Sequence, residues 1–302
     1  MRPLTLLALL VALLRVPGAA AQSDGDGLRV LVVTAHPDDE TLMAATIYRL
    51  AYELDAAVDL ALVTDGSGGF DFALMGERYY GVEIDTEPEA RDNLPAIRKQ
   101  ELMDAGRVLG LRNYFFLDQL DHHYTTNVDT VLEHVWDAGA VRDRLGHILT
   151  RGYDYVLCLL PTPETHGHHK GATILVLEAV SRMPVEERPV VLGADFANHT
   201  DLPAPDAPPF LFRGLEGYPV TEVDPDAPVF RFDRTRFMDG DHVATYQLVV
   251  NWALAAHRSQ GDLASYYDDV GAEYFWYFRL NDPARLVATA LLFQRIEDTP
   301  YE

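Results

Sequence analysis

The sequence predicts an α/β fold with a Rossmann-like, mostly parallel sheet that carries helices on both faces. Short apolar runs of strand length alternate with longer segments of helical periodicity, which is the pattern of successive β-α-β units. Hydrophobic residues make up 48% of the 302 residues, enough for a large buried core. Charged clusters follow two of the apolar runs, where α/β sheets place their functional sites.

The expected elements alternate along the chain. Strands are predicted at residues 28–33, 58–63, 114–117, 153–160 and 189–192. Helices are predicted at residues 41–54, 94–109, 128–151, 170–183 and 240–258. The only cysteine, Cys158, lies in the fourth apolar run and is expected to be a small core residue.

Three segments depart from this alternation. Residues 70–92 are an acidic insertion with aromatic side chains, which forms either a wall or lid of the cleft or a mobile loop. Residues 195–239 are rich in proline and predict strands and turns that line the site, within an irregular C-terminal extension. The dense aromatic run at residues 274–278 is expected to be packed core.

The N-terminus has the layout of a secretory signal peptide over residues 1–21. Arg2 precedes an apolar run at residues 4–14, and small residues follow at 18–21. The run is too short for a membrane span, although a retained anchor is the alternative. We expect export to the periplasm or beyond and no stable membrane insertion after cleavage. The mature chain is expected to be one domain over residues 22–302, with a core at 28–194 and an extension at 195–302.

The first charged cluster is the run AHPDDE at residues 35–40, directly after the first predicted strand. Charged groups at this density are costly to desolvate unless a cation or a hydrogen-bond network compensates them. A helix cap would account for one aspartate, but not for His36 and the second aspartate. The run therefore indicates a metal-dependent hydrolase.

The second cluster follows the fourth predicted strand and contains Glu164, His166, His168 and His169. It occupies an equivalent strand-to-helix position. Catalytic zinc usually takes three nitrogen or oxygen ligands and keeps one position for water. His36, Asp39 and one histidine of the second cluster would satisfy that requirement.

These motifs resemble the signature of the PIG-L (LmbE-like) zinc-dependent N-deacetylases, which act on N-acetylglucosamine-type amino sugars. The resemblance rests on HPDDE at residues 36–40 together with His166-x-x-His169. It extends to the glycine-containing loop at 64–69, an R-x-x-E helix that begins at Arg98, and Asp121 after the next strand. A weaker match is the run HRSQ at residues 257–260. The main resemblance covers residues 28–180.

The resemblance implies roles for the matching residues. It implies that His36, Asp39 and His169 hold one zinc ion per chain, and that Asp38 is the general base that deprotonates the metal-bound water. His166 would stabilise the tetrahedral oxyanion. Arg98 and Asp121 would bind sugar hydroxyls. For Arg98 the alternative is a helix-surface pair with Glu101, and Asp118 competes with Asp121.

Two departures from the family pattern leave roles open. Where many members have Pro-Asp between the two histidines, this chain has Gly167 and His168. His168 could replace His169 as a ligand, although its i+2 position is expected to turn it away from the face of His166. Glu164 stands where some members have tyrosine, and it is either an acid that protonates the leaving amine or a solvated loop residue. Which of Glu164 and His166 is the general acid stays open.

We expect an exported hydrolase of linear amide bonds that removes the acetyl group from an N-acetylated amino sugar or glycoconjugate. The alternatives are a metal-dependent amidase or esterase with a non-sugar acyl substrate, and a non-catalytic carbohydrate-binding protein. The formal net charge of −23 disfavours nucleic acid as a partner. A salty habitat, a cationic product or a solvated acidic surface would each explain this charge equally well. The substrate, the metal loaded in the cell and the oligomeric state stay open.

Overall fold

The computed structural model describes residues 27–198, 208–263 and 270–298. Within these residues a seven-stranded sheet has the order β3-β2-β1-β4-β5-β7-β6. Its strands are β1 (Arg29–Thr34), β2 (Ala57–Thr64), β3 (Tyr114–Gln119), β4 (Tyr155–Leu159), β5 (Val190–Asn198), β6 (Phe230–Asp233) and β7 (Val270–Tyr277). The pairs among β1 to β5 are parallel, whereas β7 pairs antiparallel with β5 and β6. The predicted α/β fold with a mostly parallel sheet is confirmed.

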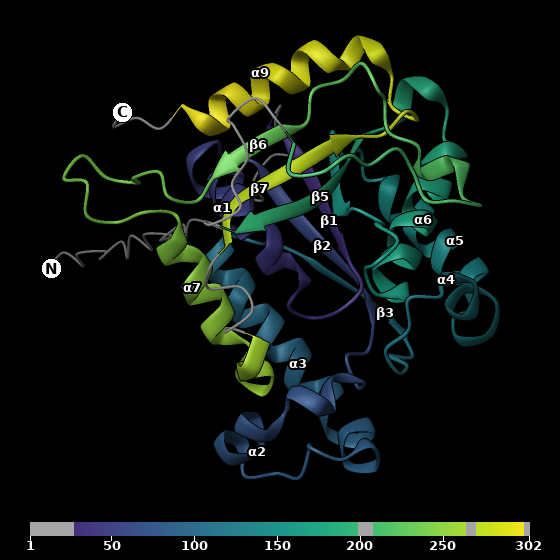
Figure 1. Ribbon diagram of the computed structural model, residues 1–302, viewed down its shortest axis with the longest axis vertical. Helices are drawn as coiled ribbons and strands as arrows, with labels where there is room; N and C mark the ends of the chain where they lie inside the picture. Colours follow the sequence, from purple (N-terminus) through teal and green to yellow (C-terminus); the bar gives the residue numbers. More distant parts are fainter. Residues whose placement is uncertain (1–26, 199–207, 264–269, 299–302) are drawn as a thin grey trace, which may run out of the picture.

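Helices cover both faces of the sheet (Figure 1). The described helices are α1 (Ala44–Tyr48), α2 (Leu74–Tyr80), α3 (Glu87–Leu109), α4 (Val128–Thr130), α5 (Ala138–Leu149), α6 (Gly167–Ser181), α7 (Gln247–Ala256) and α9 (Leu286–Glu297), with short turns between them. Helices α1, α3 and α7 lie on one face and α5 and α6 on the other. None of the described helices is long and apolar enough to cross a membrane.

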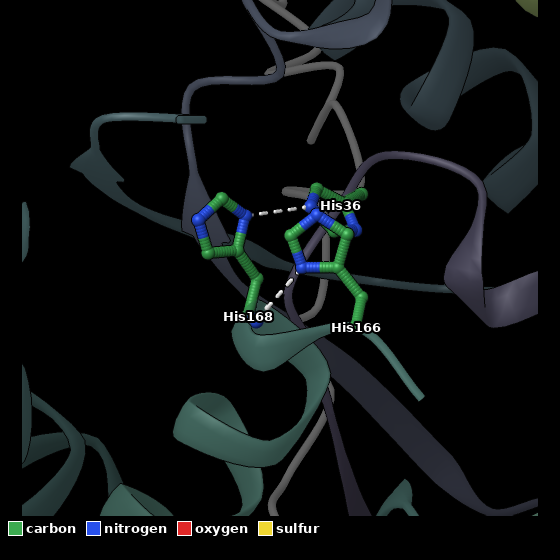
Figure 2. Close-up of side chains that lie close together, drawn as sticks. All are labelled: His36, His166 and His168. Atoms are coloured by element: carbon green, nitrogen blue, oxygen red, sulfur yellow. Dashed lines mark hydrogen bonds between the residues drawn. The ribbon is translucent and has the colours of Figure 1, made fainter. Parts of the chain in front are cut away.

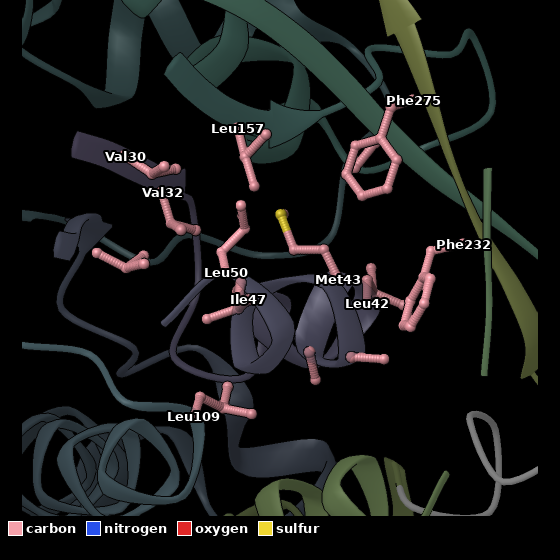
Figure 3. Close-up of a cluster of buried hydrophobic side chains, with 14 of the residues drawn as sticks. Val30, Val32, Leu42, Met43, Ile47, Leu50, Leu109, Leu157, Phe232 and Phe275 are labelled. Carbon is pink, nitrogen blue, oxygen red and sulfur yellow. The ribbon is translucent and has the colours of Figure 1, made fainter. Parts of the chain in front are cut away.

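The core forms two layers because successive strand side chains point to opposite faces. Val30 and Val32 pack toward α1, α3 and α7 in the cluster of Figure 3. Leu31 and Val33 pack toward α5 and α6 with the buried Cys158. Strands buried on both faces in this way explain the nearly continuous apolar runs of the sequence.

Several helix boundaries differ from the predicted ones. The predicted helix 128–151 is broken at Trp136, whose backbone is extended, and the Asp137 side chain caps α5 by accepting the Ala140 N–H at 2.9 Å. Helix α3 begins at Glu87, well before the expected residue 94, and keeps Pro95 inside it. The predicted helix 240–258 contracts to α7.

The C-terminal extension is more regular than its sequence predicts. Strands β6 and β7 join the same sheet, and the aromatic side chains of residues 274–278 are buried, which confirms their prediction as core. None of the described residues among 195–239 lines the site cavity, although Asp195 on β5, whose pKa burial raises, lies close enough to His169 for the charge of that histidine to oppose the rise. Residues within 208–212 and 223–231 instead line a separate cavity of about 670 Å³ beside α9. The predicted signal peptide lies outside the described residues.

Candidate active site

A cavity of about 410 Å³ opens at the carboxyl ends of the parallel strands, where α/β sheets bind their ligands. The seven residues to which the family resemblance gave roles all line it: His36, Asp38, Asp39, Arg98, Asp121, His166 and His169. The segments that follow β1, β3 and β4 supply six of these residues, and Arg98 comes from α3. The loop after β2 supplies the lining residues Gly68 and Gly69. Phe70, Asp71 and Phe72 also line it, so the first part of the insertion 70–92 forms a wall.

Three donor atoms in this cavity face one another. His169 Nε2 lies 3.1 Å from His36 Nδ1 and 3.1 Å from Asp39 Oδ1, and His36 Nδ1 lies 3.6 Å from Asp39 Oδ1. Tetrahedral ligands placed about 2.0–2.1 Å from zinc are about 3.3–3.4 Å apart. Burial opposes a positive charge on His36, but Asp121 and Asp39 raise its pKa to about 10. The three atoms and the charge around them therefore fit a divalent cation.

The Asp39 carboxylate is held in the orientation that this donor set requires. Its Oδ2 atom accepts the backbone N–H groups of Ala35 at 2.9 Å and His36 at 2.8 Å, which leaves Oδ1 toward the histidines. Burial alone would raise the pKa of Asp39, but His169 and His36 hold it well below its usual range. The hydroxyl of Thr165, 2.9 Å from Nδ1, orients the His169 ring in turn.

Asp38 sits beside the donor set in a strained backbone conformation. Its φ of 138° is rare for a residue with a side chain. Burial raises the pKa of its carboxyl, Arg98 opposes that effect, and the resulting pKa is about 6. A carboxyl with such a pKa is mostly ionised at neutral pH and readily takes up a proton.

Arg98 points inward from α3 and organises the cavity wall. Its Nη2 atom donates to Asp38 Oδ2 at 2.9 Å and to Pro37 O at 2.9 Å, and its Nη1 atom donates to Gly66 O at 2.8 Å. Arg98 is 2% exposed, so the alternative of a helix-surface pair with Glu101 is wrong. Glu101 is buried and accepts hydrogen bonds from Ser259 instead.

Asp121, rather than Asp118, belongs to the cavity. Asp118 is 56% exposed and pairs with Lys99 outside it. The Asp121 carboxylate is buried, with Oδ1 3.4 Å from His36 Nε2 and Oδ2 3.5 Å from Arg98 Nη1. Burial raises the pKa of Asp121, but His36 and the other nearby donors outweigh it and hold the pKa well below its usual range.

The rings of His166 and His168, at the start of α6, lie close to the ring of His36, with centroids 5.1 and 5.2 Å away (Figure 2). The His166 Nδ1 atom accepts the His168 backbone N–H at 3.0 Å, which leaves the proton of a neutral ring on Nε2. Burial and the nearby rings of His36 and His168 lower the pKa of His166 to about 2. The expected separation of His168 from His166 is wrong, since their ring centroids are 4.3 Å apart. His166 caps the helix from outside, so helical spacing does not apply to it.

Residues 31–180 match the model of a family described as PIG-L: GlcNAc-PI de-N-acetylase. This chain carries a PIG-L family domain. The resemblance carried by HPDDE and by the histidine pair is thereby confirmed.

Two bacterial relatives of the PIG-L domain carry the same protein name. The chain is 33% identical over 163 residues to a probable N-acetyl-alpha-D-glucosaminyl L-malate deacetylase 2 of Bacillus cereus, covering 54% of this chain and 65% of the relative. The protein of that name in Bacillus subtilis is 27% identical over 168 residues, covering 53% of this chain and 64% of the relative. The chain thus spans less than two thirds of the length of either relative.

A solved structure supports the fold of the PIG-L domain. The A40926 pseudoaglycone deacetylase Dbv21 superposes with a TM-score of 0.50 at 16% identity, covering 83% of this chain and 97% of that chain. At this identity the likeness concerns the fold alone.

The site also uses residues that sequence reasoning missed. The Tyr124 ring lies edge-on to His166 with centroids 4.9 Å apart, and Gln260 lines the cavity while donating to Gly69 O at 3.0 Å. The weak HRSQ match was the signal for Gln260. Glu164, one candidate for the general acid, is exposed and does not line the cavity.

Proposed function

We propose that this protein is a metal-dependent N-deacetylase that removes the acetyl group from an N-acetylated amino sugar or glycoconjugate. One observation carries the proposal: the donor atoms of His36, Asp39 and His169 lie within 3.6 Å of one another, in the cavity that holds Asp38. Membership in the PIG-L family and the names of the relatives support an acetyl group on a sugar nitrogen.

The cation that best suits this donor set is zinc, held by the three residues at one ion per chain. Bound zinc supplies Lewis acidity that lowers the pKa of a water molecule toward neutrality. The remaining chemistry falls to side chains of this chain.

Asp38 is the proposed base. Its carboxylate accepts one proton from the attacking water while the water oxygen bonds to the acetamide carbon. Arg98 fixes Oδ2 of Asp38 at 2.9 Å, which restricts the rotation of the carboxylate. When the C–N bond breaks, Asp38, in place of the earlier candidates Glu164 and His166, returns that proton to the leaving nitrogen and so acts as the general acid. The products are a free amine and acetic acid, which ionises to acetate.

His166 is the proposed donor to the oxyanion that forms on the carbonyl oxygen. The Nδ1 atom of His166 is occupied by a backbone N–H, so its Nε2–H is the group available to the cavity that it lines. A fixed, neutral donor of this kind stabilises charge that develops in the transition state. Arg98 and Asp121 are proposed to contact sugar hydroxyls, since both line the cavity.

A panel of acyl substrates tests the proposal. Acetate release from N-acetylglucosamine, its oligomers and its glycosides is compared with release from simple acetamides and acetate esters. Turnover confined to the acetamido sugars is the expected result. Preference for simple amides or esters would favour the amidase or esterase alternative. Sugar binding without turnover by the zinc-loaded protein would favour the carbohydrate-binding alternative.

We also propose export, on the basis of the sequence of residues 1–21. Expression in a bacterial host followed by N-terminal sequencing tests it. A processed chain that begins near Gln22 in the periplasm or medium is expected. An unprocessed chain that stays in the cytoplasm would contradict it.

A further inference from the structure

We propose that His168 is a positioning residue that fixes the ring of the metal ligand His36 through Asp121. The inference deepens the proposed function, since it rests on the metal centre formed by His36, Asp39 and His169. It concerns the position at which this chain has histidine where many PIG-L members have aspartate.

The two ring nitrogens of His36 face two different groups. Nδ1 faces Asp39 and His169. Nε2 lies 3.0 Å from Nδ1 of His168 (Figure 2) and 3.4 Å from Oδ1 of Asp121. If Nδ1 binds a cation, it carries no proton, and the neutral ring holds its proton on Nε2. The group that accepts this proton in a hydrogen bond then sets the orientation of the ligand.

Asp121 is the better acceptor of that proton. Its Oδ1 atom lies 3.3 Å from His168 Nδ1, so both histidines reach the same carboxylate oxygen. With a proton on each of the two facing nitrogens, these contacts with Asp121 replace the direct hydrogen bond between the rings that Figure 2 marks. With its single proton on Nδ1, His168 donates to Asp121 and leaves only an unpaired acceptor at Nε2. With the proton on Nε2, a buried N–H would stay unpaired, because His168 Nε2 has no partner among the described residues. Orphaned N–H groups are the rarer of the two in proteins.

Packing fixes the place of the His168 ring. His168 is 0% exposed, and its ring stacks on Trp136 with centroids 5.1 Å apart and an interplanar angle of 29°. The indole N–H of Trp136 donates to Leu120 O at 3.0 Å. The stacking on Trp136 therefore holds the His168 ring, which donates to Asp121, in place. His168 can thus orient Asp121 and, through it, His36.

The same atoms suggest one competing arrangement. His36, His166 and His168 each offer a nitrogen within 4.8 Å of the others, so a second cation could bind His36 Nε2 directly. In that arrangement Nε2 would be a ligand and not a donor. The number of zinc ions per chain distinguishes the two.

The test measures zinc affinity by competition with a chromophoric chelator, using metal-free full-length protein. We compare wild type with His168→Leu, which removes the donor, and His168→Asn, whose amide nitrogen takes the place of Nδ1. The exposed His134→Leu is the matched control. Circular dichroism and thermal unfolding of the metal-free proteins identify any variant that fails to fold.

We expect one zinc per wild-type chain, affinity weakened about 10–100-fold in His168→Leu, and affinity close to wild type in His168→Asn and His134→Leu. Wild-type affinity in a folded His168→Leu, or equal weakening by Leu and Asn, would reduce His168 to a packing role and overturn the inference. Two zinc ions per wild-type chain would overturn it in favour of the second cation. Absence of zinc from wild type would overturn the proposed function as well as the inference. This result differs from the outcomes above, in which wild type binds zinc and only the inference fails.

Discussion

His257 Nε2 lies 2.6 Å from Glu40 Oε1, and both side chains are buried. The second carboxylate oxygen of Glu40 accepts the backbone N–H of Asp38 at 3.1 Å. The C-terminal extension therefore reaches the strained residue that we propose as the catalytic base. This contact joins residues 217 positions apart in the sequence.

Replacing His257 by Leu leaves Glu40 buried without its partner. We expect the free energy of unfolding at pH 6 to fall by about 3–5 kcal/mol, as for other broken buried ion pairs, and His257→Gln to lose less because it retains an amide donor. Urea denaturation measures both. A loss below about 1 kcal/mol in His257→Leu would show that the pair has little energetic weight.

The pH dependence of the same pair has a definite sign. Burial lowers the pKa of His257, but Glu40 outweighs it and raises the pKa above the usual 6.5. The stabilisation is therefore fully present below about pH 6.5 and is lost as the pH rises through the raised pKa. The stability difference between wild type and His257→Leu should shrink with increasing pH. A difference that grows would contradict the assignment.

Asp38→Asn removes the proposed base and leaves the three donor atoms in place. We expect kcat for acetate release to fall about 10²–10⁴-fold while zinc stays at one per chain. Metal analysis and steady-state kinetics on the same preparation check this. Turnover near the wild-type rate would exclude Asp38 as the base.

A pair of substitutions distinguishes the role of His166 from that of Glu164. We expect His166→Ala to lower kcat about 10²–10³-fold, because it removes a donor to the oxyanion. Glu164→Ala should leave kcat unchanged, because Glu164 is exposed and outside the cavity. The reverse result would make Glu164 the general acid.

Gly69 permits the close approach of Arg98. A Cβ atom at residue 69 would lie 2.5 Å from Arg98 Nη1 and 2.6 Å from Gln260 Oε1. Gly69→Ala is expected to displace Arg98 and to lower kcat/KM about 10–100-fold, as misplacement near 1 Å does elsewhere. Gly146→Ala, in α5 with nothing within 4 Å of the new atom, is the control and should retain activity. Equal activity of both variants would show that the guanidinium can shift without cost.

The sequence was sufficient to predict the five parallel strands and the seven cavity residues to which the family resemblance gave roles. Strand-to-helix loops such as HPDDE carry their chemistry locally, and parallel strands bring their carboxyl ends to one edge. Contacts between distant segments leave no such local pattern. The His257–Glu40 and Ser259–Glu101 contacts, which join the extension to the core, could not be predicted for this reason.

Local context also limited the prediction at His168 and in the extension. Helical spacing placed His168 away from His166, whereas His166 is a cap with its own backbone geometry. Proline content indicated irregular structure around residues 208–231, but not which cavity that structure lines. Both outcomes depend on packing that sequence periodicity does not encode.

The central claim is that His36, Asp39 and His169 hold a metal ion on which deacetylation depends. The most direct measurement is the metal content of the purified protein together with acetate release from an N-acetylated sugar, before and after chelation and after zinc is restored. We expect about one zinc per chain, loss of acetate release on chelation and its recovery with zinc. A protein that binds no metal after zinc reconstitution, or releases acetate equally well without it, would contradict the account.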